Sequence, residues 1–274
     1  MNAIQKISIA DVELTAPEKY ILSINLRIDG LSFLIQNREK ESLHMEYFEW
    51  LNVSDWNKTI ANLSSLINEN ELLKLNYPKV QVFVQSPHTF IIPENLFSEK
   101  SLNNLYEQYL GIDSHTVQFS AIFDGSDKAY LVFGIDKEVA QLLNTKWNVQ
   151  WSHSSKFYLE NCLSSTKEGQ QVHLNFRTNY FEVAAINNGK LQAHNYFEFS
   201  STEEFIFNLL SFIRQIGFDV EELNLQVTGK VLKTAAIYKL MEKYIPNVHY
   251  NQDEDPSGEA LFEELTQAAN YENR

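Results

Sequence analysis

The hydrophobic pattern of the first third of the chain predicts three antiparallel strands, a helix and a fourth, buried strand. These elements are expected at residues 20–28, 31–37, 42–50, 55–70 and 79–84. The first strand alternates apolar and polar residues and runs into the pair Asp29-Gly30, a strong signal for a tight hairpin. Asp55 precedes apolar residues at helical spacing and can cap the helix, because its carboxylate can accept a backbone N–H.

The same order of elements is predicted a second time later in the chain. Strands are expected at residues 172–177, 180–187, 190–199 and 223–228, and helices at 201–217 and about 233–244. Asn188-Gly189 marks the second hairpin turn. Ser201 and Glu204 form a capping box that opens the first of these helices, and Gly217 ends it. Each copy is therefore β-β-β-α-β.

Three short motifs recur in the same order in the two copies. The recurring pairs are INLR (24–27) with LNFR (174–177), YFEW (47–50) with YFEF (196–199), and QV (81–82) with QV (226–227). The offsets are 150, 149 and 145 residues, and such a constant spacing indicates an internal duplication. Three antiparallel strands, a crossover helix and a parallel fourth strand describe an actin-like, ribonuclease-H-like lobe. We therefore expect an α/β fold with two such lobes, each built on a mixed sheet.

The other segments complete the expected domain organisation. The first lobe is expected over residues 1–168 with an inserted subdomain at about 85–135, and the second lobe over residues 169–250. Further elements are expected between the two copies: strands at 116–122 and 129–135, and helices near 99–110 and 137–147.

Residues 251–274 are expected to form a polar tether, beginning NQDEDPSG, and a short C-terminal helix. One face of this helix would carry Leu261, Phe262, Leu265 and Ala269. That face is expected to dock on the body of the protein, and the alternative is a tail that binds a partner.

Charge and composition narrow the classes of partner. The 274 residues carry a net charge of −14, with 36 acidic and 22 basic residues, only five of which are arginines. Binding of duplex nucleic acid or of an anionic membrane surface requires clustered basic residues, so neither partner is expected. The single Cys162 excludes an internal disulfide and a multi-cysteine metal site. The N-terminus lacks the pattern of a secretory signal, and the expected location is cytoplasmic.

Four segments resemble a Bacteroidetes family of uncharacterised proteins. They are YFEVAAINNGKL, YFEFSSTEEF and YKLMEKYIPNVHY in the second copy, and ILSINLRIDGLSFLI in the first. The resemblance covers nearly the whole chain. It implies an actin-like ATPase fold and assigns no activity.

The resemblance directs attention to the residues that actin-like ATPases use. These enzymes place an Asp near the end of the first strand of each lobe, followed by Gly and Ser or Thr in the hairpin, to organise hydrated Mg²⁺ and to cradle phosphate. Here the equivalent positions hold Asn25 and Asn175, with Arg27 and Arg177 two places further on. An asparagine cannot act as a general base, and an arginine side chain would crowd the amide cradle.

Two weaker matches to the ATPase pattern exist. A shifted alignment would make Asp29 the acid, but the second copy then offers only Asn179, and Asp29 is better explained as a turn residue. Thr228-Gly229 partly matches the glycine pair that packs against adenosine, yet a tight turn after a strand gives the same residues. No GxxxxGK[ST] loop and no paired-histidine metal motif occurs, so no cofactor and no metal is expected.

The sequence therefore favours a non-catalytic, degenerate actin-like ATPase that binds a protein or a small ligand as a binding or scaffold module. Its candidate residues would line the cleft between the lobes: Asn25, Arg27, Asp29, Asn175, Arg177, Thr228 and Gly229. A first alternative is a divergent ATPase or small-molecule kinase that uses Asp29 and Thr228-Gly229 with ATP and Mg²⁺. A second, resting on fold analogy alone, is a cytoplasmic adaptor for an envelope assembly or secretion machine.

Overall fold

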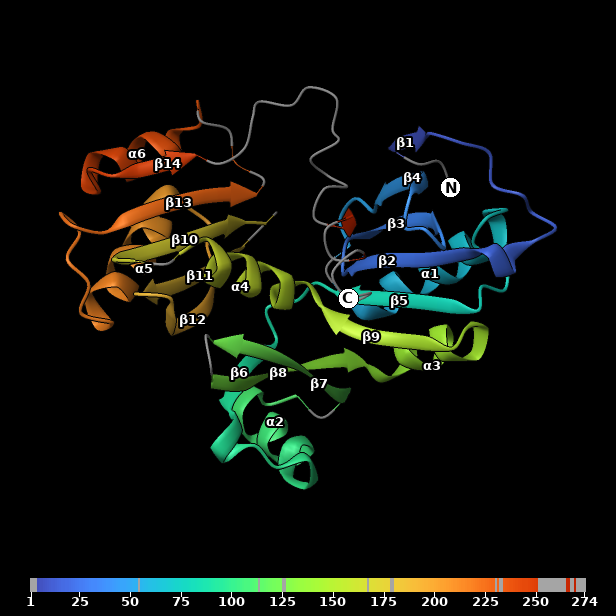
Figure 1. Ribbon diagram of the computed structural model, residues 1–274, viewed down its shortest axis with the longest axis horizontal. Coiled ribbons are helices and arrows are strands. Elements are labelled where there is room, and N and C mark those ends of the chain that lie inside the picture. Colours follow the sequence, from blue (N-terminus) through green and yellow to red (C-terminus); the bar gives the residue numbers. More distant parts are fainter. Residues whose placement is uncertain are drawn as a thin grey trace.

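Three sheets organise the computed structural model into two lobes and a smaller subdomain (Figure 1). The structure describes residues 4–53, 55–112, 114–124, 127–166, 168–177, 180–229, 231, 234–250, 265–266 and 269. Short 3-10 helices occur at η1 (Pro17–Lys19), η2 (Glu94–Leu96) and η3 (Glu99–Ser101).

The first lobe is a six-stranded sheet with the strand order β1-β4-β3-β2-β5-β9. Its strands are β1 (Gln5–Ser8), β2 (Tyr20–Arg27), β3 (Gly30–Asn37), β4 (Ser42–Glu49), β5 (Lys79–Val84) and β9 (Val149–His153). Strands β2, β5 and β9 run parallel, and the other neighbours are antiparallel. One face of the sheet packs against α1 (Trp56–Glu69) and α3 (Lys137–Lys146).

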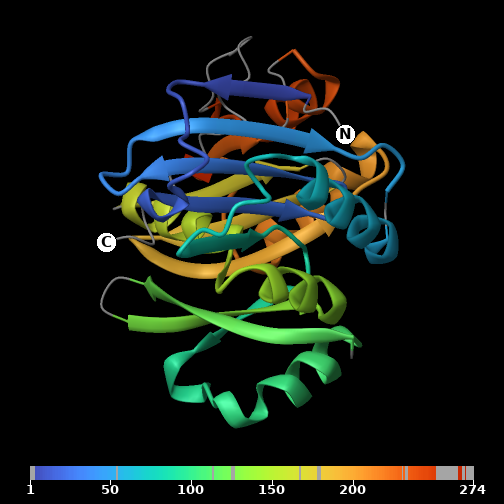
Figure 2. The ribbon, with the colours of Figure 1, turned by 90° about the vertical axis from the view of Figure 1, so that its right-hand side faces the viewer.

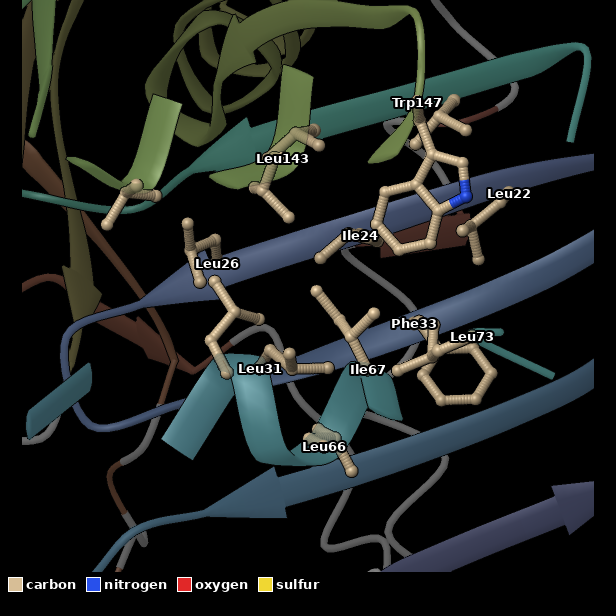
Figure 3. Close-up of a cluster of buried hydrophobic side chains, with 14 of the residues drawn as sticks. Leu22, Ile24, Leu26, Leu31, Phe33, Leu66, Ile67, Leu73, Leu143 and Trp147 are labelled. Atoms are coloured by element: carbon tan, nitrogen blue, oxygen red, sulfur yellow. The ribbon is translucent and has the colours of Figure 1, made fainter. Parts of the chain in front are cut away.

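Apolar and polar residues alternate along β2, and this alternation defines the two faces of the sheet. Leu22, Ile24 and Leu26 are at most 1% exposed and point toward the helices, where they meet Leu66 and Leu143 (Figure 3). Burial of each such side chain contributes roughly 1.5–3 kcal/mol, so this cluster is a main source of the lobe's stability. The intervening residues of β2 are polar and lie on the opposite face.

The second lobe repeats the first without an equivalent of β1 among the described residues. Its sheet has the order β12-β11-β10-β13-β14, formed by β10 (Gln170–Phe176), β11 (Tyr180–Asn187), β12 (Lys190–Glu198), β13 (Asn224–Gly229) and β14 (Val248–Tyr250). Helices α5 (Thr202–Gln215) and α6 (Ala236–Tyr244) cover the face that corresponds to the face under α1 and α3. The duplication predicted from the recurring motifs is confirmed: Ile24 pairs with Val82 as Leu174 pairs with Val227.

The inserted subdomain is a small three-stranded sheet with one helix. It consists of β6 (Thr89–Pro93), α2 (Leu102–Leu110), β7 (His115–Asp124) and β8 (Asp127–Asp136), with the strand order β6-β8-β7. In Figures 1 and 2 it lies below the two large sheets, with α2 on its far side. Its other face packs on the second lobe through Ile122, Leu131 and Leu191.

Helix α4 (Ser154–Ser165) leads from the end of β9 into the second lobe (Figure 1). Phe157 contacts Phe83 of the first lobe at a ring distance of 5.2 Å, whereas Leu159 packs beside Ala184 of the second lobe. The helix is therefore buried from both sides. None of the described helices has the length and apolar character needed to cross a membrane.

Two residues of the expected C-terminal helix are among those that the structure describes. Leu265 and Ala269 are 1% and 0% exposed and pack with Met45 and Phe157. Leu261 and Phe262, expected on the same face of this helix, lie outside the described residues.

Both predicted helix caps are present. The Asp55 carboxylate accepts a hydrogen bond from the Lys58 N–H at 3.0 Å, and Ser201 Oγ accepts one from the Glu204 N–H at 3.1 Å. The Glu204 carboxylate reaches back to the N–H of Ser200 at 2.9 Å. These contacts satisfy donors that a helix start leaves without partners.

The first hairpin differs from the prediction in its turn. Ile28 and Asp29 form the turn, and Gly30 is already the first residue of β3, paired with Arg27. A Cβ on Gly30 would lie 2.2 Å from the Phe48 carbonyl oxygen and 2.7 Å from the Arg27 guanidinium. Glycine is needed here for space rather than for a left-handed turn.

Candidate functional site

The polar residues singled out in the sequence lie at the carboxyl ends of the central strands. Figure 1 shows β2 and β5 of the first lobe and β10 and β13 of the second pointing toward each other across the middle of the molecule. Ligands of open α/β sheets bind beyond the carboxyl ends of parallel strands, so this is the place where a site is expected.

Matching rows of side chains cross the two sheets at these ends. In the first lobe, Asn25 lies between Phe83 on β5 and Ser32 on β3. In the second lobe, Asn175 lies between Thr228 on β13 and Glu182 on β11. The rows continue to Tyr47 on β4 and Tyr196 on β12. We call the face that carries each row the inner face of that lobe.

Arg27 folds back onto its own lobe. It donates to the Phe48 carbonyl oxygen at 3.0 Å and to the Asp29 carboxylate at 3.3 Å, and its guanidinium lies 4.6 Å from the Tyr47 ring centre. The residue is 7% exposed. These contacts hold the positive charge inside the first lobe, and they give Asp29 the role of turn residue and partner of Arg27.

Arg177 is held inside the second lobe by a carboxylate. Its Nη2 lies 3.8 Å from Oε2 of Glu182, which is 1% exposed. Oε1 of Glu182 lies 2.9 Å from His194 Nε2 and accepts a hydrogen bond from the Tyr196 hydroxyl at 3.3 Å. Burial alone would raise the pKa of Glu182, but the His194 contact and the Arg177 charge outweigh it and lower the pKa. Glu182 is therefore a buried carboxylate that stays ionised.

Helix α4 closes over this cluster. Ser155 Oγ is hydrogen-bonded to the Tyr196 hydroxyl, and the Tyr158 hydroxyl donates to the His173 carbonyl oxygen at 2.6 Å. His153 caps the helix by accepting the Ser155 N–H at 3.2 Å. The inner face of the second lobe is thus fastened to a helix that starts in the first lobe.

Asn25 has one satisfied and one unsatisfied end. Its Nδ2 donates to Gln85 Oε1 at 3.3 Å, whereas its Oδ1 is buried with no hydrogen-bond partner among the described residues. The Oγ of the neighbouring Ser32 is also buried, and no residue that the structure describes is its hydrogen-bond partner. An amide supplies neither a proton acceptor for catalysis nor a charge for a metal, so this end of β2 offers hydrogen bonding alone.

The pairing of β13 with β10 explains why Thr228 and Gly229 occur at their positions. Thr228 Oγ1 donates to the Leu174 carbonyl oxygen at 3.0 Å. Gly229 has a φ of 89°, and a Cβ there would lie 2.2 Å from the Phe176 carbonyl oxygen and 2.5 Å from Asn175 Oδ1. The close pairing of β13 with β10 therefore requires glycine. The neighbouring Lys230 of the predicted motif lies outside the described residues.

Gly229→Ala is expected to lower the free energy of unfolding by about 3 kcal/mol, because the new Cβ meets backbone as well as adopting an unfavourable φ. Gly217→Ala is the matched control: its φ is 73°, but no atom of the described part of the chain lies within 4 Å of the added Cβ. Its cost is expected to be about 1 kcal/mol, from the φ alone. Urea unfolding of both variants measures the difference. Equal losses of stability in the two variants would contradict this prediction, and would mean that β13 and β10 can move apart at Gly229 at little cost in free energy.

The sequence did not identify the groups that fill the second lobe. Glu182, His194, Ser155 and His153 were not among the candidate residues, although a charged residue within the apolar stretch YFEVAAIN was a usable signal for Glu182. Cys162 is buried, and burial raises the pKa of its thiol well above the usual value. Among the described residues, no group of three His, Cys, Asp or Glu is placed to hold a metal ion.

Comparisons with known proteins agree with this fold. The family model described as "Protein of unknown function (DUF3822)" matches residues 10–248. A Bacteroides thetaiotaomicron protein with actin-like ATPase fold and unknown function gives a TM-score of 0.79 at 24% identity, covering 94% of this chain and 99% of that chain. A chain of the PilM–PilN type IV pilus biogenesis complex gives 0.51 at 12% identity, covering 88% and 89%. A comparison with curated proteins finds no match.

These likenesses confirm the expected two-lobed actin-like fold and the resemblance to an uncharacterised family. At such identities they establish the fold alone, so any activity has to be argued from the residues of this chain.

Proposed function

The chain belongs to the DUF3822 family of unknown function, and we propose that it is a non-catalytic member of the actin-like fold that acts as a binding or scaffold module. The observation that carries this proposal is the state of the two arginines at the ends of β2 and β10. Arg27 and Arg177 are 7% and 8% exposed, and each is bound to groups of its own lobe.

The chemistry of nucleotide hydrolysis supports the same conclusion. Transfer of a phosphoryl group needs carboxylates for Mg²⁺ and backbone amides or free cations for the phosphates. Asn25 and Asn175 stand where the acids of actin-like ATPases are expected, and the arginines stand where glycine would let backbone amides approach. Glu182 is charged, but its carboxylate already contacts Arg177 and His194 within the second lobe.

Millimolar Mg-ATP is expected to leave the melting temperature unchanged. A nucleotide present at 100 times its Kd would add about 2.7 kcal/mol of stability, which raises Tm by roughly 5–10 °C in a chain of this size. Differential scanning fluorimetry with Mg-ATP, Mg-ADP and Mg²⁺ alone measures the effect.

A rise with either nucleotide, together with turnover that disappears in Asp29→Ala, would contradict the proposal and favour the ATPase or kinase alternative. Asp29 is the suitable position for this test because it lies in the partly exposed hairpin turn, outside the paired strands, and Arg27 is the contact of its carboxylate among the described residues. Gly229 is unsuitable, since its substitution disturbs strand pairing whether or not a nucleotide binds.

A further inference from the structure

A serine, a histidine and a glutamate form a hydrogen-bonded row at the edge of the first lobe. β1 is the edge strand of this sheet and lies beside β4 (Figure 1). Ser8 Oγ lies 2.9 Å from His44 Nδ1, and His44 Nε2 lies 2.9 Å from Oε1 of Glu46. Because side chains alternate along β4 and Tyr47 is on the inner face, His44 and Glu46 lie on the opposite face of the sheet.

The register of β1 and β4 brings these side chains together. Ser8 is paired with His44, and the Ile9 N–H donates to the Leu43 carbonyl oxygen at 2.8 Å. In an antiparallel ladder this makes Ser8 and His44 a pair without backbone hydrogen bonds between them, in which the side chains are closest. The backbone N–H of Ser8 therefore points away from β4, toward the edge of the sheet that no other described strand covers.

Glu46 determines which nitrogen of His44 carries the proton. Burial would raise the pKa of Glu46, but hydrogen bonds from His44, Lys6 and Asn70 outweigh it and lower the pKa. Lys6 Nζ lies 2.9 Å from Oε1, and Asn70 Nδ2 donates to Oε2 at 2.7 Å. Since an ionised carboxylate only accepts hydrogen bonds, a neutral His44 carries its proton on Nε2 and offers the lone pair of Nδ1 to the Ser8 hydroxyl.

The exposure of the three side chains suits a nucleophile with its base. His44 and Glu46 are each 4% exposed, and the Phe33 ring stacks beside the imidazole at a centre distance of 6.1 Å. Ser8 is exposed, so a reagent in solution can reach its Oγ. Serine hydrolases place the hydroxyl at Nε2 and the carboxylate at Nδ1. Here the two nitrogens have exchanged partners, and the proton can pass from the hydroxyl to the ring in either arrangement.

We propose that Ser8 is an activated nucleophile that takes an acyl group from an activated carboxylic ester. Its Oγ attacks the ester carbonyl carbon while His44 Nδ1 takes the hydroxyl proton. The bond from that carbon to the leaving alcohol oxygen then breaks, and the proton passes from His44 to this oxygen, which gives an acyl-serine and a free alcohol. Glu46 stabilises the imidazolium that exists between the two steps, and the Ser8 N–H is a donor for the carbonyl oxygen as it becomes negative.

This inference goes beyond the proposed binding function and does not depend on it. One acyl group per chain requires no turnover, and the site uses neither the ends of β2 and β10 nor a nucleotide. Glu46 acts through His44 and is a positioning residue, whereas Ser8 and His44 touch the reacting atoms.

p-Nitrophenyl acetate tests the proposal on the full chain. The wild type should release p-nitrophenol, and mass spectrometry after an acid quench and pepsin digestion should find the acetyl group on Ser8. Ser8→Ala removes an exposed hydroxyl, should fold as the wild type does and should lose this acetylation. His44→Ala should slow acetylation of Ser8 by about 100-fold or more. Glu46→Gln should slow it by at least about tenfold, and Glu46→Asp, which keeps the charge, should retain more of the rate.

Two controls separate activation by His44 from simple exposure. Ser164→Ala removes another exposed hydroxyl, one that donates to the Asn161 carbonyl oxygen at 2.9 Å, and should leave the rate unchanged. Free imidazole should restore at least about tenfold of the rate lost in His44→Ala, because it replaces the missing base. A residue that only supports the fold would not be replaced in this way.

The proposal is overturned if the wild type is not acetylated on Ser8, or if Ser8 is acetylated as fast in His44→Ala as in the wild type. Should His44→Ala not fold, equal rates in the wild type and Glu46→Gln would overturn it. The reaction is measured without nucleotide, so its failure leaves the Mg-ATP result standing, and a rise in Tm with Mg-ATP would contradict the proposed function alone.

Discussion

Lowering the pH from 7 to 5 is expected to remove about 6 kcal/mol from the free energy of unfolding through three buried histidines, His115, His153 and His173. Folded domains are stable by about 5–15 kcal/mol, so the protein should be close to unfolding at pH 5. Each of the three is at most 9% exposed.

The largest of the three pKa shifts is that of His153, whose pKa burial lowers to about 3. The charge of Glu182 works in the opposite direction, while His194 and Arg177 add to the lowering. The pKa of the same histidine in the unfolded chain is about 6.5. At any pH between these two pKa values, the unfolded state binds a proton that the folded state does not. Stability therefore falls as the pH drops through this window, and each unit costs about 1.4 kcal/mol.

His115 and His173 act in the same direction. Burial lowers the pKa of each to about 4; at His115, the charges of His88 and Lys137 add to the lowering and that of Asp136 opposes it. At pH 5 all three histidines remain neutral in the folded state, so each contributes a loss of about 2 kcal/mol. Glu182 stays ionised in this range because its pKa is lowered, and it does not offset the loss.

Urea unfolding at pH 7, 6 and 5 measures how the free energy of unfolding changes with pH, and the variant His153→Asn tests the contribution of one histidine. Asparagine can accept the Ser155 N–H at the helix start as His153 does. The variant should lose about 4 kcal/mol over the same interval instead of about 6. His249→Asn, at an exposed position, should keep the slope of the wild type. A wild type whose stability is flat between pH 7 and 5 would contradict the account.

The sequence predicted those parts of the fold in which a strand or helix carries its apolar residues on one face. β2 and β10 alternate because apolar residues face helices and polar residues face inward, and the recurring motifs therefore sit at equivalent places in both sheets. Asn188-Gly189 was recognised correctly, since both residues have positive φ, at 50° and 76°. The pair Asp29-Gly30 is shifted by one residue relative to its turn, because Gly30 already belongs to β3 and is paired with Arg27. The missing side chain of Gly30 leaves room for the Arg27 guanidinium.

Elements with contacts on several sides escaped prediction. α4 buries Ser155, Phe157, Leu159 and Cys162, which point in different directions because the helix lies between the lobes. No single apolar stripe marks such a helix in the sequence. The short strands β1, β6, β9 and β14 were missed as well. The contacts of the candidate site also escaped prediction, because they depend on strand register. The carboxylate beside Arg177 comes from Glu182 on β11, and the partners of Glu182, His194 and Tyr196, come from β12.

Glu182→Ala is expected to lower the free energy of unfolding by about 4 kcal/mol, the second-largest effect foreseen for this protein. The substitution leaves the guanidinium of Arg177 in a buried position without the carboxylate 3.8 Å away, and it removes the acceptor of His194 and Tyr196. Glu182→Gln should cost about half as much, since the amide oxygen can still accept hydrogen bonds but offers no charge. Glu203→Ala, on the exposed face of α5, should change stability by less than about 0.5 kcal/mol.

The double variant Arg177→Met/Glu182→Leu tests why Glu182→Ala loses stability. It separates the unpaired buried charge of Arg177 from the lost hydrogen bonds of His194 and Tyr196. Replacement of a buried ion pair by apolar side chains of similar size is often close to neutral, whereas removal of one partner is costly. The double variant should therefore recover at least half of the stability that Glu182→Ala loses, measured by the same urea titration. A double variant as unstable as Glu182→Ala would contradict this, and would assign the loss to the hydrogen bonds of His194 and Tyr196. Ser32 takes the equivalent place in the first lobe, where Arg27 is bound by the Phe48 carbonyl oxygen, the Tyr47 ring and the carboxylate of Asp29 in the turn. The fold itself therefore does not require a carboxylate at the position of Glu182.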